Sequence, residues 1–274
     1  MLKTDFVLTD DNYYLPDADR MFCSASQYKQ AIGCIGRPGC EATMLAQLRG
    51  DWEFETSMDM LIGSYVDARY EGTIEQFQEE HQELFVSRGE RKGQLKAEFI
   101  KAEQIYRRCE KDTLFSAYMS GEKQVIMTGE IAGVPFKIKM DSLHRGKCIV
   151  DLKVMQDLSK QFWVRDYGHM DFITYWGYDI QLAIYQEIYY QNTGERLPTY
   201  ICAADKGKVT DIAVIYVDDM RLRECLEAVK ANAPKIQMLK SGEIEPIRCE
   251  LCDYCKSTKV LGKPIHFSEL IGDV

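Results

Sequence analysis

Alternating apolar and polar positions predict two neighbouring strands near the middle of the chain. From Val134 to Met140 every second residue is apolar, so these side chains should line one strand face and turn toward a core. The intervening positions should face away from that core: Lys137, Lys139 and Asp141. A polar turn follows at residues 143–147, and the apolar run at residues 148–153 predicts the second strand of a hairpin.

The remaining pattern predicts helices and further strands around this hairpin. Helical periodicity runs through residues 20–120, with breaks in the glycine-containing stretches 33–39 and 89–93. Three more strands and a covering helix are expected: strands at residues 124–129, 199–204 and 211–217, the last two as a hairpin, and the helix at residues 218–239. The sequence therefore predicts an α/β fold with a central mixed sheet flanked by helices and a helical N-terminal region.

Asp151 and Lys153 suggest what the second strand does. They are two residues apart, so their side chains share one strand face, and the hairpin brings Asp141 beside them. Two neighbouring carboxylates repel each other unless a divalent cation neutralises them, and Mg²⁺ prefers oxygen ligands. Such an ion could activate water for phosphodiester hydrolysis while Lys153 orients that water or stabilises the developing charge. The alternative is a surface ion pair, since Glu90 and Lys92 match the same spacing in a hydrophilic stretch.

A predicted helix at residues 171–190 supplies a third feature. Four side chains recur at three- and four-residue steps and should share one face: Tyr178, Gln181, Tyr185 and Tyr189. A tyrosine stripe at this spacing is also typical of a helix packed on a core. Gln181 fits that alternative poorly, because a buried amide needs hydrogen-bond partners.

Together these residues resemble the PD-(D/E)xK nuclease superfamily, and within it the RecB and RecE exonuclease branch. The resemblance rests on Asp141, on the Asp-Leu-Lys run at residues 151–153, and on the Gln-x-x-x-Tyr motif formed by Gln181 and Tyr185. Upstream, Ile62-Gly-Ser-Tyr-Val-Asp67 is similar to the Gly-x-x-x-His segment of that branch. Asp67 stands where the family has a histidine, so an oxygen ligand replaces a nitrogen ligand; the alternative is an ordinary acid on a helix surface.

The resemblance implies a restriction-endonuclease-like core and a role for each of these residues. Mg²⁺ or Mn²⁺ would be bound by the carboxylates of Asp67, Asp141 and Asp151 and by the backbone carbonyl of Leu152. Lys153 would be the catalytic lysine. Gln181 and Tyr185 would position the DNA backbone or the lysine.

The most similar group is that of the RecE-like phage and prophage exonucleases. It implies a DNA-binding exonuclease that resects one strand of linear double-stranded DNA in recombination or repair and leaves single strand for an annealing protein. Related exonucleases often form rings, which makes a homo-oligomer the expectation by analogy. The alternative function is a noncatalytic nucleic-acid-binding or structural module with the same fold.

Composition sets the scale of the molecule. A chain of 274 residues with 46% hydrophobic residues can bury one sizeable core. We expect one nuclease domain over residues 1–274, mostly helical at residues 20–120, with the catalytic core at residues 124–240 and a cysteine cluster at residues 249–255. No run of residues has the length of a membrane span or the apolar core of a signal peptide. The expectation is a cytoplasmic protein without a membrane partner.

The net charge of −9 argues against a nonspecific DNA-binding protein, because affinity for phosphates grows with the number of cations that contact them. The objection weakens if the positive charge is concentrated near the proposed site. Seven basic residues surround it in the sequence: Lys137, Lys139, Arg145, Lys147, Lys153, Lys160 and Arg165. The alternative is that these residues form an ordinary solvated surface.

Three of the ten cysteines follow one another at three-residue steps: Cys249, Cys252 and Cys255. Without an export signal, disulfides are not expected, and three closely spaced thiolates can converge on one metal ion or cluster. The fourth ligand must come from elsewhere, and Cys34, which follows a short predicted helix opened by Ser24, is the best candidate.

Similar nucleases of the RecB branch use one N-terminal and three C-terminal cysteines to hold an iron-sulphur cluster that joins the ends of the domain. The likeness implies the same staple for Cys34 and the C-terminal three, although Cys40 competes with Cys34. A [4Fe-4S] cluster, zinc and no metal stay open as alternatives.

Overall fold

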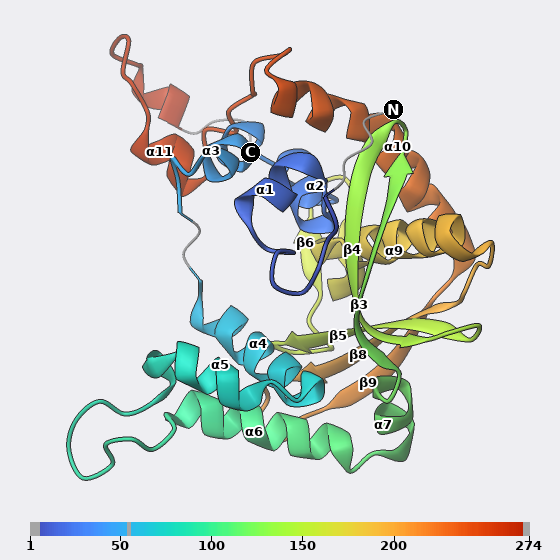
Figure 1. Cartoon of the computed structure of the whole chain (residues 1–274). Helices are drawn as coiled ribbons and strands as arrows, with labels where there is room; N and C mark the ends of the chain where they lie inside the picture. The colour runs from blue at the N-terminus through green and yellow to red at the C-terminus, as the bar shows by residue number, and fades with distance from the viewer. Residues whose placement is uncertain (1–5, 54–55, 271–274) are drawn as a thin grey trace.

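A five-stranded mixed sheet organises the chain, which is represented by a computed structural model that describes residues 6–53 and 56–270. The strand order is β3-β4-β5-β8-β9 (Figure 1). Only β5 and β8 pair in parallel, and the other neighbours are antiparallel. The strand bounds are β3 Glu122–Ile131, β4 Val134–His144, β5 Cys148–Met155, β8 Thr199–Asp205 and β9 Ile212–Val217.

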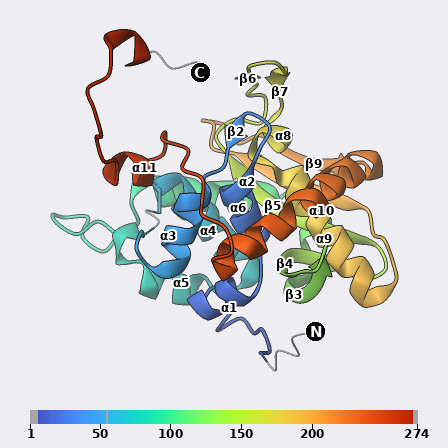
Figure 2. The ribbon, with the colours of Figure 1, turned by 90° about the horizontal axis from the view of Figure 1, so that it is seen from above.

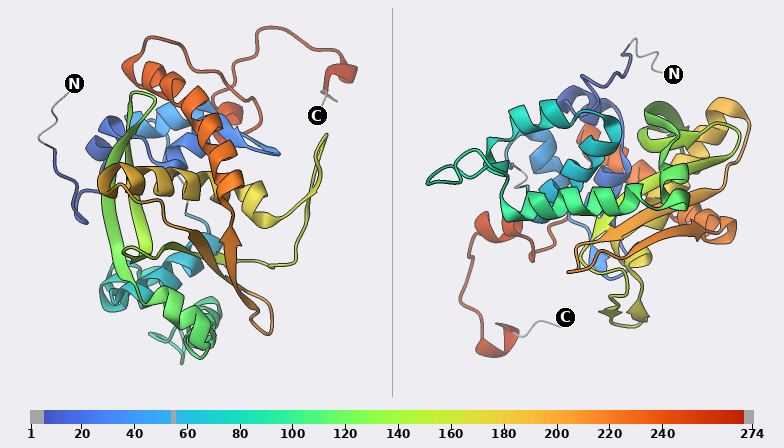
Figure 3. Two further views of the ribbon diagram at one scale, coloured as in Figure 1. Left: turned by 90° about the vertical axis from the view of Figure 1, so that its right-hand side faces the viewer. Right: turned by 90° about the horizontal axis from the view of Figure 1, so that it is seen from below.

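Helices cover both faces of this sheet. One face packs against α2 (Ala25–Ile32), α3 (Glu41–Arg49), α9 (Tyr178–Thr193) and α10 (Asp219–Ser241). The other face packs against α4 (Met58–Glu71), α6 (Ala97–Glu110) and α7 (Thr113–Met119). In Figure 1 these two groups lie above and below β5, β8 and β9, and Figure 3 shows α6 running across the lower side. The sheet is thus the middle of three layers.

The alternation along β5 determines which helix faces the proposed site. Ile149 belongs to the core beneath α9 and α10, whereas Val150 and Leu152 belong to the core on the α4 and α6 side. Because successive strand side chains point to opposite faces, Asp151 and Lys153 point to the same side as Ile149. They therefore face α9.

Strand β4 leaves β5 after a short stretch of pairing. The register joins only three residue pairs, from Ser142 with Val150 to His144 with Cys148, while the pairing of β4 with β3 extends from Leu143 to Val134. Part of its freed edge is occupied by the N-terminal segment. The amide of Cys23 donates to the carbonyl of Pro135 at 2.8 Å.

The remaining elements are short. They are α1 (Pro16–Met21), β1 (Gly33–Cys34), β2 (Arg37–Pro38), α5 (Ile74–Glu80), η1 (Gln82–Leu84), β6 (Phe162–Val164), β7 (Gly168–Met170), α8 (Phe172–Trp176), α11 (Asp253–Ser257) and η2 (Phe267–Leu270). The β6–β7 hairpin and the C-terminal arm extend from the body of the molecule (Figures 2 and 3). No helix in the described ranges is both long and apolar enough to cross a membrane.

The expected mixed sheet and its strand positions are confirmed, including the β8–β9 hairpin and the helix that follows it. One helix prediction is wrong. The run at residues 171–190 is two helices, α8 and α9, interrupted at Gly177, whose φ is +63°. A Cβ at this position would lie 2.9 Å from Lys29 Cδ, so the break combines a left-handed backbone with a close approach of α2.

Gly33 and Gly50 form a pair for mutation. Gly33 ends α2 and starts the turn toward residue 40, and Gly50 ends α3. Their φ values are +88° and +82°, but an added Cβ would lie 2.4 Å from the carbonyl oxygen of Arg37 at Gly33 and would meet nothing within 4 Å at Gly50. Gly50→Ala should lower the free energy of unfolding by about 1 kcal/mol, the cost of a left-handed backbone.

Gly33→Ala should lower it by about 3 kcal/mol or more, because the Gly33 backbone (ψ −167°) lies outside the left-handed helical region that Gly50 occupies (ψ 11°) and a clash with backbone adds to that cost. Urea denaturation of both variants beside the parent measures the difference. Equal losses at the two positions would contradict the close approach at Gly33.

Candidate active site and cysteine centre

Where β4 and β5 separate, the Asp141 carboxylate accepts a hydrogen bond from the β5 backbone. Ser142 and Val150 are the last residue pair on this side of the ladder. One position further, Asp141 Oδ2 accepts a hydrogen bond of 2.7 Å from the backbone N–H of Leu152. A side-chain oxygen thus replaces a backbone carbonyl, which fixes the Asp141 carboxylate next to the β5 backbone.

Asp151 is almost fully buried, with 1% of its surface exposed. Its Oδ1 atom accepts a hydrogen bond of 2.7 Å from Gln181 Nε2. Its Oδ2 atom forms an ion pair with the ammonium group of Lys153, yet accepts no hydrogen bond of acceptable geometry from the described part of the chain. A carboxylate oxygen has two lone pairs, so Oδ2 can contact both this ammonium and a metal ion.

Gln181 connects Asp151 to the tyrosine on the next helical turn. Its Nε2 atom also donates to the hydroxyl of Tyr185 at 2.9 Å, so both protons of the amide group have acceptors. Burial raises the pKa of Tyr185 well above its ordinary value, and the hydroxyl stays protonated. The stripe on α9 is therefore partly core and partly site, since Tyr189 belongs to the core.

Lys153 lies between the acids and an aromatic ring. Its ammonium group is 5.0 Å from the centre of the Tyr178 ring and donates to the Leu152 carbonyl at 3.2 Å. Burial by itself would lower the pKa of Lys153, but the charges of Asp151 and Asp141 outweigh it and raise that pKa. Lys153 is therefore a cation at neutral pH.

Asp67 reaches the same cleft from α4 on the other side of the site. The cleft has a volume of about 660 Å³, and Asp67, Asp141, Asp151 and Lys153 all line it. Burial and then the charge of Asp141 raise the pKa of Asp67 well above its ordinary range. Asp67 is accordingly part of the cleft and not an ordinary acid on a helix surface.

The charges in the cleft favour a divalent cation. Burial and then the charge of Asp151 raise the pKa of Asp141 to about 7, and Lys153 only partly offsets them. Their oxygens are less tightly gathered than a closed cage, because in the described residues only a cysteine group brings all its ligand atoms within 4.8 Å. Mg²⁺ keeps several waters and uses one or two carboxylates, so it does not require a closed cage.

The expected basic cluster does not form one free surface around the cleft. Lys137 is buried against Asp19, Lys139 pairs with Asp10 at 3.1 Å, and Arg145 pairs with Glu122 at 2.7 Å. Lys137 faces away from the core of its strand as expected, but the N-terminal segment covers it. Three of the seven basic residues, Lys137, Lys139 and Lys153, do line the cleft, but the first two are paired with acids of the N-terminal segment.

Sequence reasoning missed Lys29, Tyr13 and Tyr14, which also line the cleft. Lys29 donates to the Trp176 carbonyl at 3.3 Å and lies 5.2 Å from the Tyr178 ring. Burial, with the nearby charge of Lys153, lowers the pKa of Lys29 to about 8. No spacing rule links these positions to residues 141–153, since tertiary packing alone brings the N-terminal segment to the cleft.

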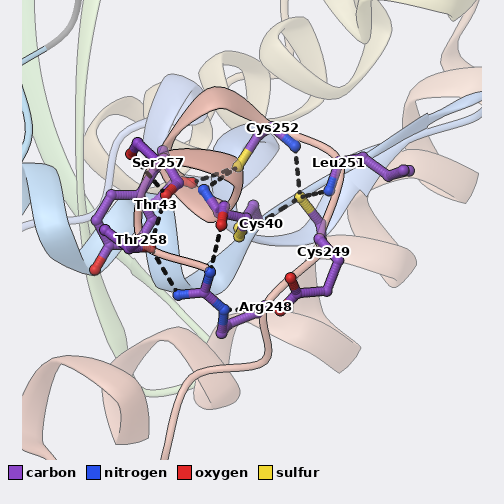
Figure 4. Close-up of polar contacts among 11 residues, drawn as sticks. Cys40, Thr43, Arg248, Cys249, Leu251, Cys252, Ser257 and Thr258 are labelled. Carbon is purple, nitrogen blue, oxygen red and sulfur yellow. Dashed lines mark hydrogen bonds and ion pairs between the residues drawn. The ribbon is translucent and has the colours of Figure 1, made fainter. Parts of the chain in front are cut away.

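A second site lies between the two ends of the chain, where four cysteines gather: Cys40, Cys249, Cys252 and Cys255. All four sulfur atoms are within 4.8 Å of one another; Cys40 and Cys255 are 3.5 Å apart, and Cys249 and Cys255 are 4.0 Å apart. Cys40 precedes α3, Cys252 stands directly before α11 and Cys255 lies within it. Figure 4 shows Cys40, Cys249 and Cys252 close together. The three C-terminal cysteines converge as expected.

The expectation that Cys34 supplies the fourth ligand is wrong. Its thiol donates to the Tyr175 carbonyl at 3.2 Å, and the β1–β2 hairpin reverses the chain directly after it. Cys40 takes that place, because it stands at the start of α3 and α3 packs against α11.

Hydrogen bonds favour the thiolate form by lowering the pKa of Cys40 and Cys252, whereas burial raises the pKa of Cys249 and Cys255. Burial would raise the pKa of Cys40, but hydrogen bonds, first from Thr43, lower it to about 6, and the Thr43 hydroxyl is 3.0 Å from Cys252 Sγ. Thiolates are the form that binds metals. A tetrahedral ion with metal–sulfur bonds of about 2.3 Å requires sulfur separations of about 3.8 Å, close to those between Cys255 and its two neighbours.

Comparison with known proteins identifies the family to which the chain belongs. Residues 24–258 match the model of a family described as a PDDEXK-like domain of unknown function (DUF3799). A crystal structure described as "putative exonuclease" from Eubacterium rectale is 48% identical and has a TM-score of 0.93, covering 98% of this chain and 100% of that one.

Another matched structure, that of SSO0001, is 13% identical with a TM-score of 0.27, covering 72% of this chain and 85% of that one, and supports no argument. No functionally curated protein matches. The family model covers most of the chain, including Cys40 and the residues from Asp67 to Cys255. The chain therefore belongs to the PDDEXK-like DUF3799 family and has the restriction-endonuclease-like fold of the PD-(D/E)xK superfamily.

Proposed function

We propose that this protein is a Mg²⁺-dependent deoxyribonuclease that degrades linear double-stranded DNA from its ends. The observation that carries the proposal is the meeting of Asp141, Asp151 and Lys153 where β4 and β5 separate. The family match supports nuclease chemistry, and the 48% identical protein described as "putative exonuclease" supports action at DNA ends.

The proposed metal ligands are the carboxylates of Asp141 and Asp151 and the carbonyl of Leu152, with Asp67 as a third carboxylate of the cleft. Mg²⁺ or Mn²⁺, when bound, would polarise the scissile phosphate and lower the pKa of a bound water. The buried Oδ2 atom of Asp151, which has a lone pair beyond the one that faces Lys153, supports this assignment.

Lys153 is proposed as the group that binds the charge developing on the phosphate. Asp151 and Asp141 keep it protonated, so it acts as a cation and not as a base. Gln181 is proposed to hold Asp151 in its orientation through the 2.7 Å hydrogen bond, and Tyr185 to hold Gln181. Both would position reacting groups without accepting a proton themselves.

The finer biological role is proposed from the resemblance to RecE-like enzymes. In that role the protein resects linear DNA in phage-related recombination or repair, works with a single-strand annealing protein and assembles as a homo-oligomer. A noncatalytic nucleic-acid-binding module with the same fold is the competing function, and loss or retention of DNA cleavage separates the two.

The four cysteines are proposed to hold a structural metal. The sulfur separations support one tetrahedral ion such as Zn²⁺, while a [4Fe-4S] cluster would require the sulfurs to spread around a larger core. Such a metal would join α3 to α11. It would also support the catalytic cleft, because Met44 and Gln47 of α3 line that cleft.

The first experiment compares linear and closed-circular plasmid incubated with the protein and Mg²⁺, with EDTA as the metal-free control. We expect loss of linear DNA only. Asp151→Asn should reduce that cleavage by about 100-fold or more, because it removes a metal-binding charge without changing side-chain volume. Glu90→Gln is the matched control, since Glu90 has the same spacing to a lysine but is exposed in a distant loop.

The control should cleave as the parent does, with both variants folded by circular dichroism. Cutting of the closed circle would show an endonuclease. Parent protein that cuts neither DNA in Mg²⁺ would favour the noncatalytic module, and an Asp151→Asn variant within a few-fold of the parent would remove Asp151 from the proposed site.

The raised pKa of Asp141 predicts pH-dependent metal binding. As the pH falls through about 7, the metal-free carboxyl gains a proton and loses the charge that attracts Mg²⁺. The Mg²⁺ concentration for half-maximal cleavage should therefore rise from about pH 8 to about pH 6, by up to about tenfold per pH unit. Calorimetry of Mn²⁺ binding should detect proton release near neutral pH. A constant Mg²⁺ requirement across this range, with no proton release, would contradict the prediction.

Cys252→Ser should abolish metal binding at the cysteine centre and lower the thermal stability of the protein. Cys34→Ser is the matched control, because Cys34 lies outside the four-sulfur group and a serine hydroxyl can replace its hydrogen bond to Tyr175. Metal analysis and absorption spectra of anaerobically purified protein distinguish one zinc ion from iron. Metal retained by Cys252→Ser, or lost by Cys34→Ser, would contradict the assignment of the four ligands.

A further inference from the structure

The β6–β7 hairpin carries two large aromatic side chains into solvent. Trp163 and Tyr167 are 70% and 62% exposed. Along the chain, the hairpin follows β5, which carries Asp151 and Lys153, and precedes α8 and α9. Gln181 is part of α9. Figures 2 and 3 show it projecting from the body of the molecule. Single exposed aromatic side chains are common on protein surfaces. Two of them on one projecting hairpin, directly after the strand that carries Asp151 and Lys153, suggest a binding surface.

Contacts at its base hold the hairpin in place. The Phe162 ring stacks on the Tyr175 ring with a centroid distance of 4.0 Å and an interplanar angle of 9°. Val164 is buried against Gly36 of the β1–β2 turn, where an added Cβ would lie 2.3 Å from a Val164 methyl group. Trp163 itself contacts only His169 edge to face, at 5.3 Å, among the ring contacts of the described residues. The base is packed, and the indole is presented outward.

A continuous series of aromatic and cationic groups joins this base to the cleft. Phe162 is 6.1 Å from the Trp176 ring, over which the Arg37 guanidinium lies at 3.8 Å. The Trp176 carbonyl accepts from Lys29, and Lys29 and Lys153 both lie about 5 Å from the Tyr178 ring. Rings and cations in alternation are the groups that bind nucleobases and phosphates.

The charge of the protein makes stacking important for DNA binding. The net charge is −9, and lysines near the cleft are paired with acids, Lys137 with Asp19 and Lys139 with Asp10. Attraction to phosphates is correspondingly weak. Stacking of a base on an aromatic ring contributes about 1–3 kcal/mol without using charge.

We infer that Trp163 and Tyr167 bind nucleobases of the DNA substrate by stacking, at its end or in its unpaired strand, outside the catalytic cleft. This inference rests on the proposed function and adds a specific contact to it. The hairpin is a binding element, and the chemistry stays with Asp141, Asp151 and Lys153.

The test measures binding and cleavage separately. Binding of a fluorescent linear duplex with a short single-stranded overhang is measured by anisotropy with Asp151→Asn protein, which is expected to bind without cutting. Adding Trp163→Ala should weaken binding roughly 5- to 150-fold, the equivalent of one lost stacking contact. Trp163→Phe should keep most of the affinity, and Tyr167→Ala should weaken binding in the same direction.

Tyr216→Ala is the matched control, because Tyr216 is a half-exposed aromatic on the edge strand β9 at the other end of the sheet order; it should bind as the parent does. A Trp163→Ala affinity within about twofold of the parent, on DNA that the wild-type protein cleaves, would overturn the hairpin contact and leave the proposed function intact. Absence of both binding and cleavage by the wild-type protein would overturn both. A Trp163→Phe loss as large as that of Trp163→Ala would show that stacking is not the interaction.

Discussion

The hydrogen bond from the Leu152 amide to the Asp141 carboxylate is the constraint on which the candidate site depends. It stands where the β4–β5 ladder would otherwise continue, so the strands can separate without leaving the Leu152 amide unpaired. The separation opens the cleft, and the same bond keeps one carboxylate at its floor. Because this carboxylate is hydrogen-bonded to a paired strand, its position is as rigid as the sheet.

The sheet and the central residues of the site were predictable because their signals are local. A period of two along β4 and β5 determined which side chains share a face, and this placed Asp151 with Lys153 correctly. Gln181 was recognisable as an amide within a tyrosine stripe, and its bonds to Asp151 and Tyr185 explain why a polar residue stands there. Each of these inferences needed only neighbours within a few residues or one hairpin.

The parts that the sequence did not predict depend on contacts between distant segments. Cys34 and Cys40 have equally suitable side chains, and only the packing of α3 on α11 selects Cys40. Lys137 has the pattern of an exposed strand residue, but Asp19 and the Tyr13 carbonyl cover it. The interruption at Gly177 likewise follows from the approach of α2. No local rule contains this information, since each partner lies more than a hundred residues away or in a different layer.

The pairing of Lys139 with the exposed carboxylate of Asp10 has a consequence for how the cleft would respond to salt. A lysine in water normally exchanges its small-ion atmosphere for a phosphate, and the release of those ions makes binding steeply dependent on ionic strength. Here the anion that a phosphate would displace from Lys139 is the Asp10 carboxylate, which stays attached to the protein after it is displaced. A polyanion that binds Lys139 would therefore release fewer mobile ions than the number of its contacts suggests, and the slope of its affinity against salt would be correspondingly shallow.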